Sequence, residues 1–326
     1  MLPKMPQTVE QYNSYNRVVK GRSEKTVSEY EHDLLLFFRF IKVYKEGGKC
    51  DEKTLSETDI SDIGIQEIRE ITTEDILRFL RYAAQDRNNS AVTRSRKLSS
   101  IKGYFKYLYV QLKCIDYNPA ANIDSPKKRA SLPKYLTLEE SLALLDAAEK
   151  DTKNHYRERD YCILTLFLNC GIRLSELTGL SLSDIDREYR SMRVIGKGNK
   201  ERIVYLNEAC AKALAKYMAV RGNDPDIKDK NALFISRNHR RISNQMVQVI
   251  VYKYLDMAGL GYKHYSVHKL RHTAATLMYQ TGKVDVRVLK DILGHEQLNT
   301  TQIYTHVSDK GMEEAMKQNP LGKAKK

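Results

Sequence analysis

The chain lacks features that define several classes of protein. Its 326 residues contain no apolar run long enough to span a membrane, and segment 1–16 has no apolar core of a secretory signal. This pattern predicts a protein that stays in the cytoplasm, where its cysteines are reduced rather than paired in disulfides or bound to a metal. The cysteines are odd in number and widely spaced, without a C-x-x-C pair: Cys50, Cys114, Cys162, Cys170 and Cys210.

The usual signatures of metal-dependent chemistry are also missing. His268 and His272 have the spacing of a zinc-binding helix, but Lys269 stands where H-E-x-x-H requires glutamate. The positive charge of Lys269 between two potential ligands disfavours the binding of a metal ion. With no Walker lysine motif and no evident Asp/Glu cluster, we expect no metal, no cofactor and no metal-dependent transposase chemistry.

The charge of the chain is strongly unbalanced. Lysine and arginine total 55 against 41 acidic residues, which gives a net charge of +14 and a pI of about 9.3. Cations that contact phosphates release condensed counterions, so a basic chain favours a polyanionic partner. Charge alone leaves nucleic-acid binding and incidental basicity equally open. The 41% hydrophobic and 29% charged shares are typical of a soluble globular protein.

Proline is scarce and divides the chain. None lies between Pro6 and Pro119, and three prolines then fall within 15 residues. Because proline breaks helices, a long proline-free stretch permits helices and a cluster is typical of a linker. We therefore predict an N-terminal domain over 1–118, a linker over 119–134 and a second domain over 135–326.

The N-terminal domain has the periodicity of helices. Residues 46–72 are predicted to be a longer loop or short helix, and Thr73 opens a further helix that runs through Tyr82. Ser23 is a plausible cap of an earlier helix. The apolar residues of that earlier helix are Val27, Tyr30, Leu34, Phe37, Phe38 and Ile41.

Segment 90–113 predicts a helix with two different faces. Short hydroxyls and long cations on one face can contact phosphates and base edges in a major groove, although a solvated charged face is the commoner explanation. The same two explanations apply to the linker cations Lys127, Lys128 and Arg129. The apolar face of the helix comprises Leu98, Ile101, Phe105, Leu108 and Leu112. The polar face comprises Thr93, Arg94, Arg96, Lys97, Ser100 and Lys102.

The second domain is predicted to be mainly helical with one small sheet. Thr137 carries a helix start signal, and Tyr161–Asn169 is a buried apolar helix. Segment 192–206 alternates β-forming residues around a glycine-rich turn, which predicts a hairpin. Further helices are predicted over 209–220, 244–257, 270–280, 286–293 and 311–318.

Six residues of this domain form a set suited to phosphate chemistry. His295 follows Arg271 by 24 residues, and Tyr304 follows His295 by nine. Each residue alone has a commoner structural explanation, such as a salt bridge at a helix start, an exposed turn or a packed ring. Together they supply cations, proton carriers and a nucleophile without metal ligands. In chain order they are Arg173, Lys197, His268, Arg271, His295 and Tyr304.

Around these residues the chain closely resembles the tyrosine recombinase (phage integrase) family, and its Xer-like branch in particular. The segments that carry the resemblance are GIRLSELTGL, VIGKGNKERIV, HKLRHTAAT and LGHEQLNTTQIYTHV. The resemblance is strong over the second domain and rests on helix pattern and length in the first. It implies a mainly α fold with an N-terminal helical, SAM-like core-binding domain that clamps DNA. A C-terminal helical catalytic domain with a small β-sheet would follow.

The chemistry needs an in-line nucleophile, stabilised charge on the nonbridging oxygens and a proton for the leaving group. The planar paired donors of Arg173 and Arg271 suit a clamp on those oxygens. The resemblance implies that Tyr304 is the nucleophile of a 3′-phosphotyrosyl intermediate. Among the cations of the hairpin it selects Lys197 as the general acid. We expect its neighbours, Lys200 and Arg202, on DNA.

Three further residues complete the expected site. His268 fits a general acid or base that takes the tyrosine proton. His295 would donate a hydrogen bond to the scissile phosphate. Glu176 lies one helical turn after Arg173, where it either orients an arginine or histidine or pairs within the fold.

The resemblance implies a site-specific recombinase of double-stranded DNA, with four copies on two duplexes and possible pairing with a paralogous recombinase. Chromosome or plasmid resolution and mobile-element integration or excision stay open, and segment 311–318 either docks on a neighbouring copy or packs in cis. A type IB topoisomerase-like enzyme and a non-catalytic DNA-binding regulator are the alternatives. The chain departs from the family pattern in a longer 46–68 region and an extended 281–285 turn, and the first leaves DNA docking open.

Overall fold

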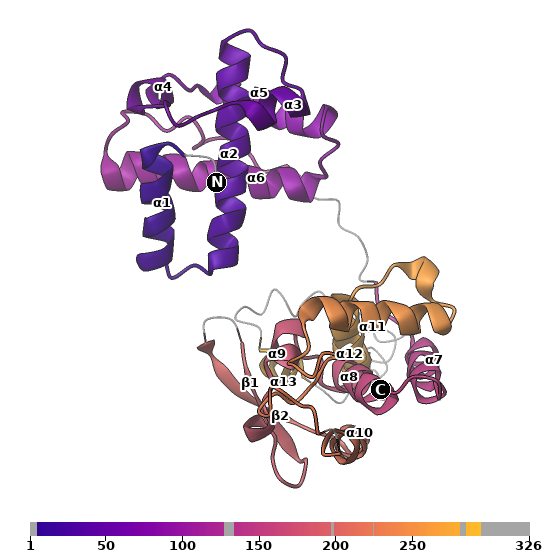
Figure 1. Cartoon of the computed structure of the whole chain (residues 1–326). Helices are drawn as coiled ribbons and strands as arrows, with labels where there is room; N and C mark the ends of the chain where they lie inside the picture. The colour runs from indigo at the N-terminus through magenta and orange to yellow at the C-terminus, as the bar shows by residue number, and fades with distance from the viewer. Residues whose placement is uncertain (1–4, 127–133, 197–198, 224, 281–284, 295–326) are drawn as a thin grey trace, which may run out of the picture. The chain divides into compact units, whose positions relative to one another are not determined.

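The structure is a computed structural model that describes all residues except 1–4, 127–133, 197–198, 224, 281–284 and 295–326. The chain divides into two compact units, Met1–Ala130 and Ser131–Lys326, and each is described by itself (Figure 1). The domain limits at 118 and 135 stay predictions. In the described part of the chain, no helix combines the length and the apolar character needed to cross a membrane.

The first unit is helical. Its long helix α2 is crossed by α6, and the remaining helices pack around this pair (Figure 1). The core is aromatic, with Phe37 stacked edge-on against Phe79 at 5.2 Å between ring centroids. The helices are α1 (Gln7–Val18), α2 (Glu24–Lys45), α3 (Glu52–Glu57), α4 (Ile65–Arg69), α5 (Thr73–Gln85) and α6 (Ala91–Lys106).

Local capping explains where these helices begin. The hydroxyls of Ser23 and Ser90 accept the backbone N–H groups of Thr26 and Thr93, which confirms both predicted starts. Thr72 caps α5 in a reciprocal capping box with Asp75. The region that was predicted as a loop or short helix contains α3 and α4.

The helix predicted over 90–113 differs from the observed one at its end. The α-helix stops at Lys106 and a π-helical turn, Tyr107–Leu112, continues it until Lys113 adopts a left-handed conformation with φ of 51°. Leu112 is exposed rather than part of the core. The change in helical pitch rotates the last turn, so the regular apolar spacing no longer predicts which side chains are buried.

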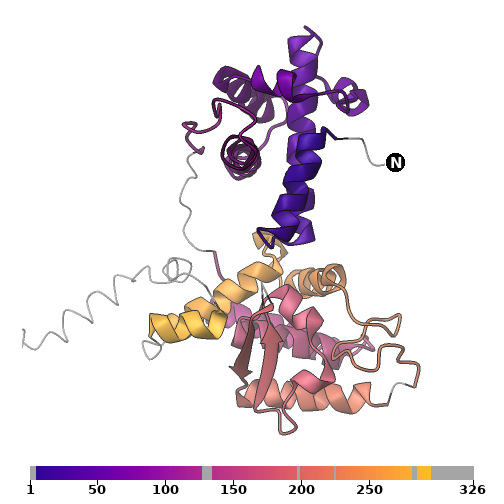
Figure 2. The ribbon, with the colours of Figure 1, turned by 90° about the vertical axis from the view of Figure 1, so that its left-hand side faces the viewer.

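The second unit is built around the buried helix α8. Helices α7, α10 and α12 pack against α8, and α13 lies beside α12 (Figure 2). The predicted apolar helix over Tyr161–Asn169 is confirmed, with Ile163, Leu164 and Phe167 fully buried. The helices are α7 (Leu138–Glu149), α8 (Arg157–Cys170), α9 (Leu174–Gly179), α10 (Glu208–Arg221), α11 (Asn244–Met257), α12 (Val267–Gln280) and α13 (Val286–Leu293).

The predicted hairpin is confirmed. Strands β1 (Ser191–Ile195) and β2 (Glu201–Tyr205) are antiparallel, and Val194 pairs with Arg202. Val194 and Val204 face the core, while Ile203 is exposed on the other face. Within the described residues the sheet has two strands, so the mainly helical fold with one small sheet is confirmed.

Candidate active site

Arg271 lies on α12 and is almost completely buried, with 2% of its surface exposed. Its Nη1 donates to the carbonyl oxygen of Gly171 at 2.7 Å, and its Nη2 donates to that of Leu293 at 2.6 Å. Gly171 ends α8 with φ of 58°, where a Cβ atom would lie 2.9 Å from the side chain of Leu293. Glycine at this position therefore lets α8 and α13 meet around the Arg271 guanidinium.

Arg173 occupies the N-cap position of α9. Its Nη1 donates to Oε1 of Glu176 at 2.7 Å, and its Nη2 donates to the carbonyl oxygen of Gly294 at 2.8 Å. The side chain is 31% exposed, so it reaches solvent where Arg271 does not. A guanidinium carries five N–H groups. These two bonds leave three N–H groups of Arg173 without a partner in the described part of the chain.

Three arginines of the site contact the end of α13. The final carbonyls of a helix lack partners within it and carry the negative end of the helix dipole. Gly294 follows with φ of 62° and ends the helix. The carbonyl groups of Ile292, Leu293 and Gly294 accept, in that order, from Arg202, Arg271 and Arg173. Three arginines from distant parts of the sequence thus hold the segment that leads into His295.

Glu176 is a buried carboxylate shared between two arginines. Besides the Arg173 side chain, it accepts the backbone N–H of Arg173 at 2.8 Å and both Nη atoms of Arg202 at 2.8 and 3.0 Å. Burial by itself would raise the pKa of Glu176, but the hydrogen bonds from Arg202 and Arg173 outweigh it and lower the pKa to about 2. Glu176 therefore stays ionised and orients both arginines.

Arg202 corrects a prediction. We expected its side chain on DNA, but it points from β2 into the protein and is only 15% exposed. Its three nitrogen atoms bind Glu176 and the carbonyl oxygen of Ile292. The sequence places Arg202 beside other cations of the hairpin, and only its inward register opposite Val194 distinguishes it. Lys200 is exposed, as a DNA contact requires.

His268 lies in the first turn of α12, which begins three residues earlier than predicted. Burial is the main cause that lowers the pKa of His268, and the charge of Arg271 lowers it further. The rings of His268 and His272 lie edge to face, 4.9 Å apart. Burial, together with the charges of His268 and Lys269, lowers the pKa of His272 to about 4. Both rings are therefore neutral near pH 7, which leaves His268 able to accept a proton.

Some predicted residues lie outside the part of the chain that the structure describes. They are Lys197, His295 and Tyr304 of the expected catalytic set and Lys127, Lys128 and Arg129 of the expected linker. The predicted helix 311–318 also lies outside it. The described residues thus contain Arg173, His268 and Arg271 from the set of six, with Glu176 and Arg202 beside them.

The expected DNA-binding face of α6 is partly wrong. Lys97 is buried, and its Nζ atom donates to Oδ1 of Asp33 at 3.0 Å. Ser100 is fully buried and donates to the same carboxylate at 2.8 Å. Asp33 lies three residues after Tyr30 and four before Phe37, which puts it on the core side of α2. That helical spacing was the sequence signal for a buried partner of Lys97.

Other residues of that face keep contact with solvent. Arg96 also binds Asp33, at 2.6 Å, but its side chain is 38% exposed and pairs with Glu29. Thr93, Arg94 and Lys102 are half-buried. These side chains stay predicted DNA contacts, whereas Lys97 holds α6 against α2.

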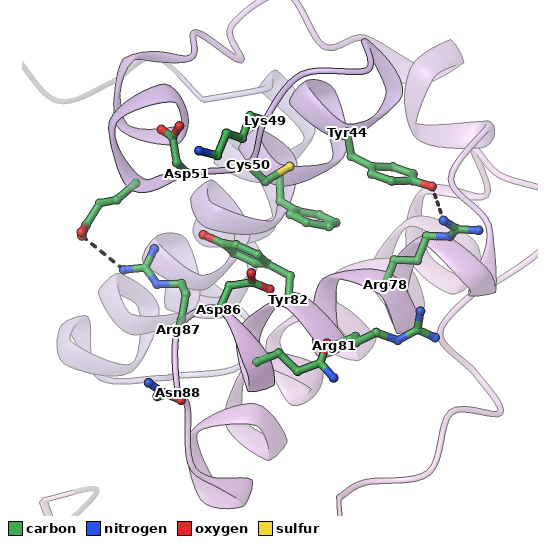
Figure 3. Close-up of a pocket in the computed structure, with 13 residues that line it drawn as sticks. Tyr44, Lys49, Cys50, Asp51, Arg78, Arg81, Tyr82, Asp86, Arg87 and Asn88 are labelled. Atoms are coloured by element: carbon green, nitrogen blue, oxygen red, sulfur yellow. Dashed lines mark hydrogen bonds and ion pairs between the residues drawn. The ribbon is translucent and has the colours of Figure 1, made fainter.

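A cavity of about 780 Å³ lies elsewhere in the first unit (Figure 3). Tyr82 and Cys50 lie near its centre, and Arg78 and Arg87 lie on opposite sides. Arg78 donates to the hydroxyl of Tyr44, and Arg87 pairs with Glu52 at 3.6 Å. The lining contains none of the predicted site residues, so this cavity is separate from the candidate active site.

Comparisons with known proteins identify the family of the chain. The Phage integrase family matches residues 134–311, and the Phage integrase, N-terminal SAM-like domain matches residues 54–111. Tyrosine recombinase XerC of Caldanaerobacter subterraneus subsp. tengcongensis is 46% identical, over 98% of this chain and 88% of that protein. Tyrosine recombinase XerD of Rickettsia bellii is 33% identical, over 93% of this chain and 95% of that protein.

Several solved structures resemble the structure of this chain. XerA recombinase is 28% identical with a TM-score of 0.51, and the match covers 98% of this chain and 99% of that one. XerH bound to its difH substrate before cleavage is 23% identical with a TM-score of 0.68, over 94% and 84%. A lambda integrase tetramer bound to a Holliday junction is 17% identical with a TM-score of 0.64, over 91% and 76%. The last two show the fold alone.

The chain therefore belongs to the phage integrase family, the tyrosine recombinases. Within it, the chain is a Xer-type site-specific recombinase that cleaves and rejoins DNA strands. Both the resemblance inferred from the motifs and the predicted enzyme class are confirmed.

Proposed function

We propose that Arg173 and Arg271 bind the scissile phosphate and that Tyr304 attacks it. The phenolic oxygen of Tyr304 forms a bond to phosphorus while the bond to the 5′ oxygen breaks. His268 takes the phenolic proton, and Lys197 gives a proton to the leaving oxygen. Attack by a 5′-hydroxyl reverses these steps, so bond energy is conserved and rejoining needs no external energy source.

The convergence of the arginines on the end of α13 carries this proposal. Arg173 and Arg271 reach adjacent carbonyl groups from separate helices, which fixes the separation of the two guanidiniums before DNA binds. Preorganised donors of this kind contribute on the order of a few kcal/mol each to transition-state stabilisation. The exposed N–H groups of Arg173 are the accessible part of the clamp.

The lowered pKa of His268 supports its role as the proton acceptor. A general base must be unprotonated at working pH, and burial beside Arg271 keeps the His268 ring neutral near pH 7. His295 would add a hydrogen bond to the phosphate. The glycine that precedes it, Gly294, is held by Arg173.

The proposed partner is double-stranded DNA. Four copies of the protein would bind two duplexes together, and the reaction would take place in the cytoplasm. A lambda integrase tetramer on a Holliday junction and XerH on its difH substrate have the same fold, which supports this arrangement. The net charge of +14 supports the choice of partner. Thr93, Arg94, Arg96, Lys102 and Lys200 would contact DNA, together with the linker cations Lys127, Lys128 and Arg129.

Covalent capture on randomised, nicked duplexes tests this function. Wild type should give a detergent-resistant adduct enriched in one sequence, and Tyr304→Phe should bind the same DNA without an adduct. Adducts without sequence enrichment would instead favour a topoisomerase-like enzyme. DNA binding without any adduct would overturn the proposed catalytic role.

A further inference from the structure

Arg202 lies between the segments that build the active site. Its position on β2 belongs to the hairpin that carries Lys197, yet its guanidinium binds Glu176 of α9 and the last turn of α13. A Cβ atom at position 294 would lie 2.9 Å from Nη1 of Arg202, so the arginine packs directly against Gly294. Arg202 thus touches both the carboxylate that orients Arg173 and the residue that precedes His295.

Glu176 has a fully enclosed side chain and two counter-ions in the described part of the chain. Ionised groups in such a site need compensation, and loss of one partner leaves the charge undercompensated. Without Arg202, Arg173 would be the remaining described counter-ion. The fork of a guanidinium matches both oxygens of one carboxylate. Arg173 would then turn more of its N–H groups toward Glu176 and away from solvent.

We propose that Arg202 is a positioning residue for recombination: it neutralises Glu176, so that Arg173 keeps donors for the scissile phosphate, and it holds the end of α13, which directly precedes His295 in the sequence. The inference rests on the proposed function, because it assumes that Arg173 binds that phosphate. It replaces the expectation from sequence that Arg202 contacts DNA.

In this proposal, Glu176 and the scissile phosphate compete for the N–H groups of Arg173, and this competition makes a specific prediction. If Arg202 acts by neutralising a carboxylate, removal of that carboxylate's charge should relieve the loss of Arg202. A residue with only a packing role would show no such relief, since Glu176→Gln removes further contacts. Arg202→Lys should lie between wild type and Arg202→Met, because lysine keeps the charge without the fork.

The experiment uses full-length protein and a nicked duplex carrying the sequence enriched by covalent capture. Single-turnover cleavage by Arg202→Met should fall about a hundredfold. DNA affinity should stay within about threefold, and the slope of log affinity against log salt should not change. The double variant Arg202→Met/Glu176→Gln should cleave at least about tenfold faster than Arg202→Met, which corresponds to an activation free energy lower by about 1.4 kcal/mol.

Two results would overturn the proposal. Loss of affinity in step with cleavage, with a salt slope smaller by about 0.9, would make Arg202 a phosphate contact. A double variant no faster than Arg202→Met would exclude the neutralising role. Each rate is measured at a temperature below the unfolding transition of the variant. Arg202→Lys supplies a second, milder variant. If wild-type protein forms no covalent adduct, the proposed function itself is refuted.

Discussion

Nη2 of Arg271 donates to the carbonyl oxygen of Leu293 at 2.6 Å, so the guanidinium on α12 is fixed to the last turn of α13. The same guanidinium binds Gly171, two residues before Arg173. One buried side chain thereby links α12 to the end of α8, just before Arg173, and to the last turn of α13. Loss of its geometry should affect catalysis before it affects DNA binding.

Arg271→Lys tests this relationship. Lysine keeps the charge but cannot reach two carbonyl groups as a planar fork, so cleavage should fall by about 10²–10³ while DNA affinity changes little. Single-turnover cleavage and equilibrium binding on the same nicked duplex measure the two effects. Equal losses in rate and affinity would contradict a role confined to the reaction.

Gly294→Ala should damage both stability and activity. The residue has φ of 62°, and the new Cβ would meet the Arg202 guanidinium at 2.9 Å. We expect a loss of about 1–3 kcal/mol in the free energy of unfolding. Gly179→Ala is the matched control, because nothing lies within 4 Å of a Cβ built at this position and its φ is not left-handed. Denaturant unfolding in which both variants behave alike would contradict this explanation.

Acid should destabilise the second unit through His272. The folded-state pKa is lowered to about 4, below the unfolded value of about 6.5. Neutral His272 therefore contributes fully to the free energy of unfolding above pH 6.5. This contribution is lost as the pH falls from 6.5 through 4, because the unfolded chain binds the proton first. The loss should be on the order of 1–3 kcal/mol between pH 7 and pH 4.

Urea unfolding of wild type and His272→Asn across this range measures that contribution. The variant should be less stable at pH 7 but should lose less stability on acidification. Identical pH dependence in the two proteins would assign the acid sensitivity to other groups. The pKa of Glu176 is lowered to about 2, so its contribution is lost between an unfolded pKa of about 4.3 and pH 2 and overlaps this window only at its acid end.

Lys97→Met should destabilise the first unit rather than weaken contacts to DNA. The buried Asp33 would lose one of its cations, at a cost of about 3–5 kcal/mol. Lys97→Met/Asp33→Asn should be more stable than the sum of the single variants predicts. Thermal unfolding measures these differences, and full additivity would contradict the buried pair.

Arg94→Met is the companion variant for DNA binding. Its predicted contact is with phosphate, so the slope of log affinity against log salt should shrink by about 0.9 with little change in stability. Lys97→Met, assayed below its unfolding transition, should leave that slope unchanged. A smaller slope for Lys97→Met would make Lys97 a DNA contact, as predicted from sequence, and an unchanged slope for Arg94→Met would remove Arg94 from the predicted contacts.

The sequence predicts this fold well where structure is local. The caps at Ser23 and Ser90 depend on side chains three residues from their targets, and the hairpin depends on alternation around a turn. Arg202 and Lys97 were assigned wrongly because a cation's direction depends on partners far away in sequence. Glu176 is 26 residues from Arg202, and Asp33 is 64 from Lys97. Periodicity gives the face of an element but not the buried charge that meets it.

The most direct test of the account is to map the covalent adduct within the protein. Wild-type protein captured on the enriched duplex is digested with protease and nuclease, and mass spectrometry locates the residue that retains a nucleotide. We predict a single modified peptide, with a 3′-phosphate joined to Tyr304. A nucleotide on another of the 21 tyrosines, or an adduct that survives Tyr304→Phe, would contradict the account.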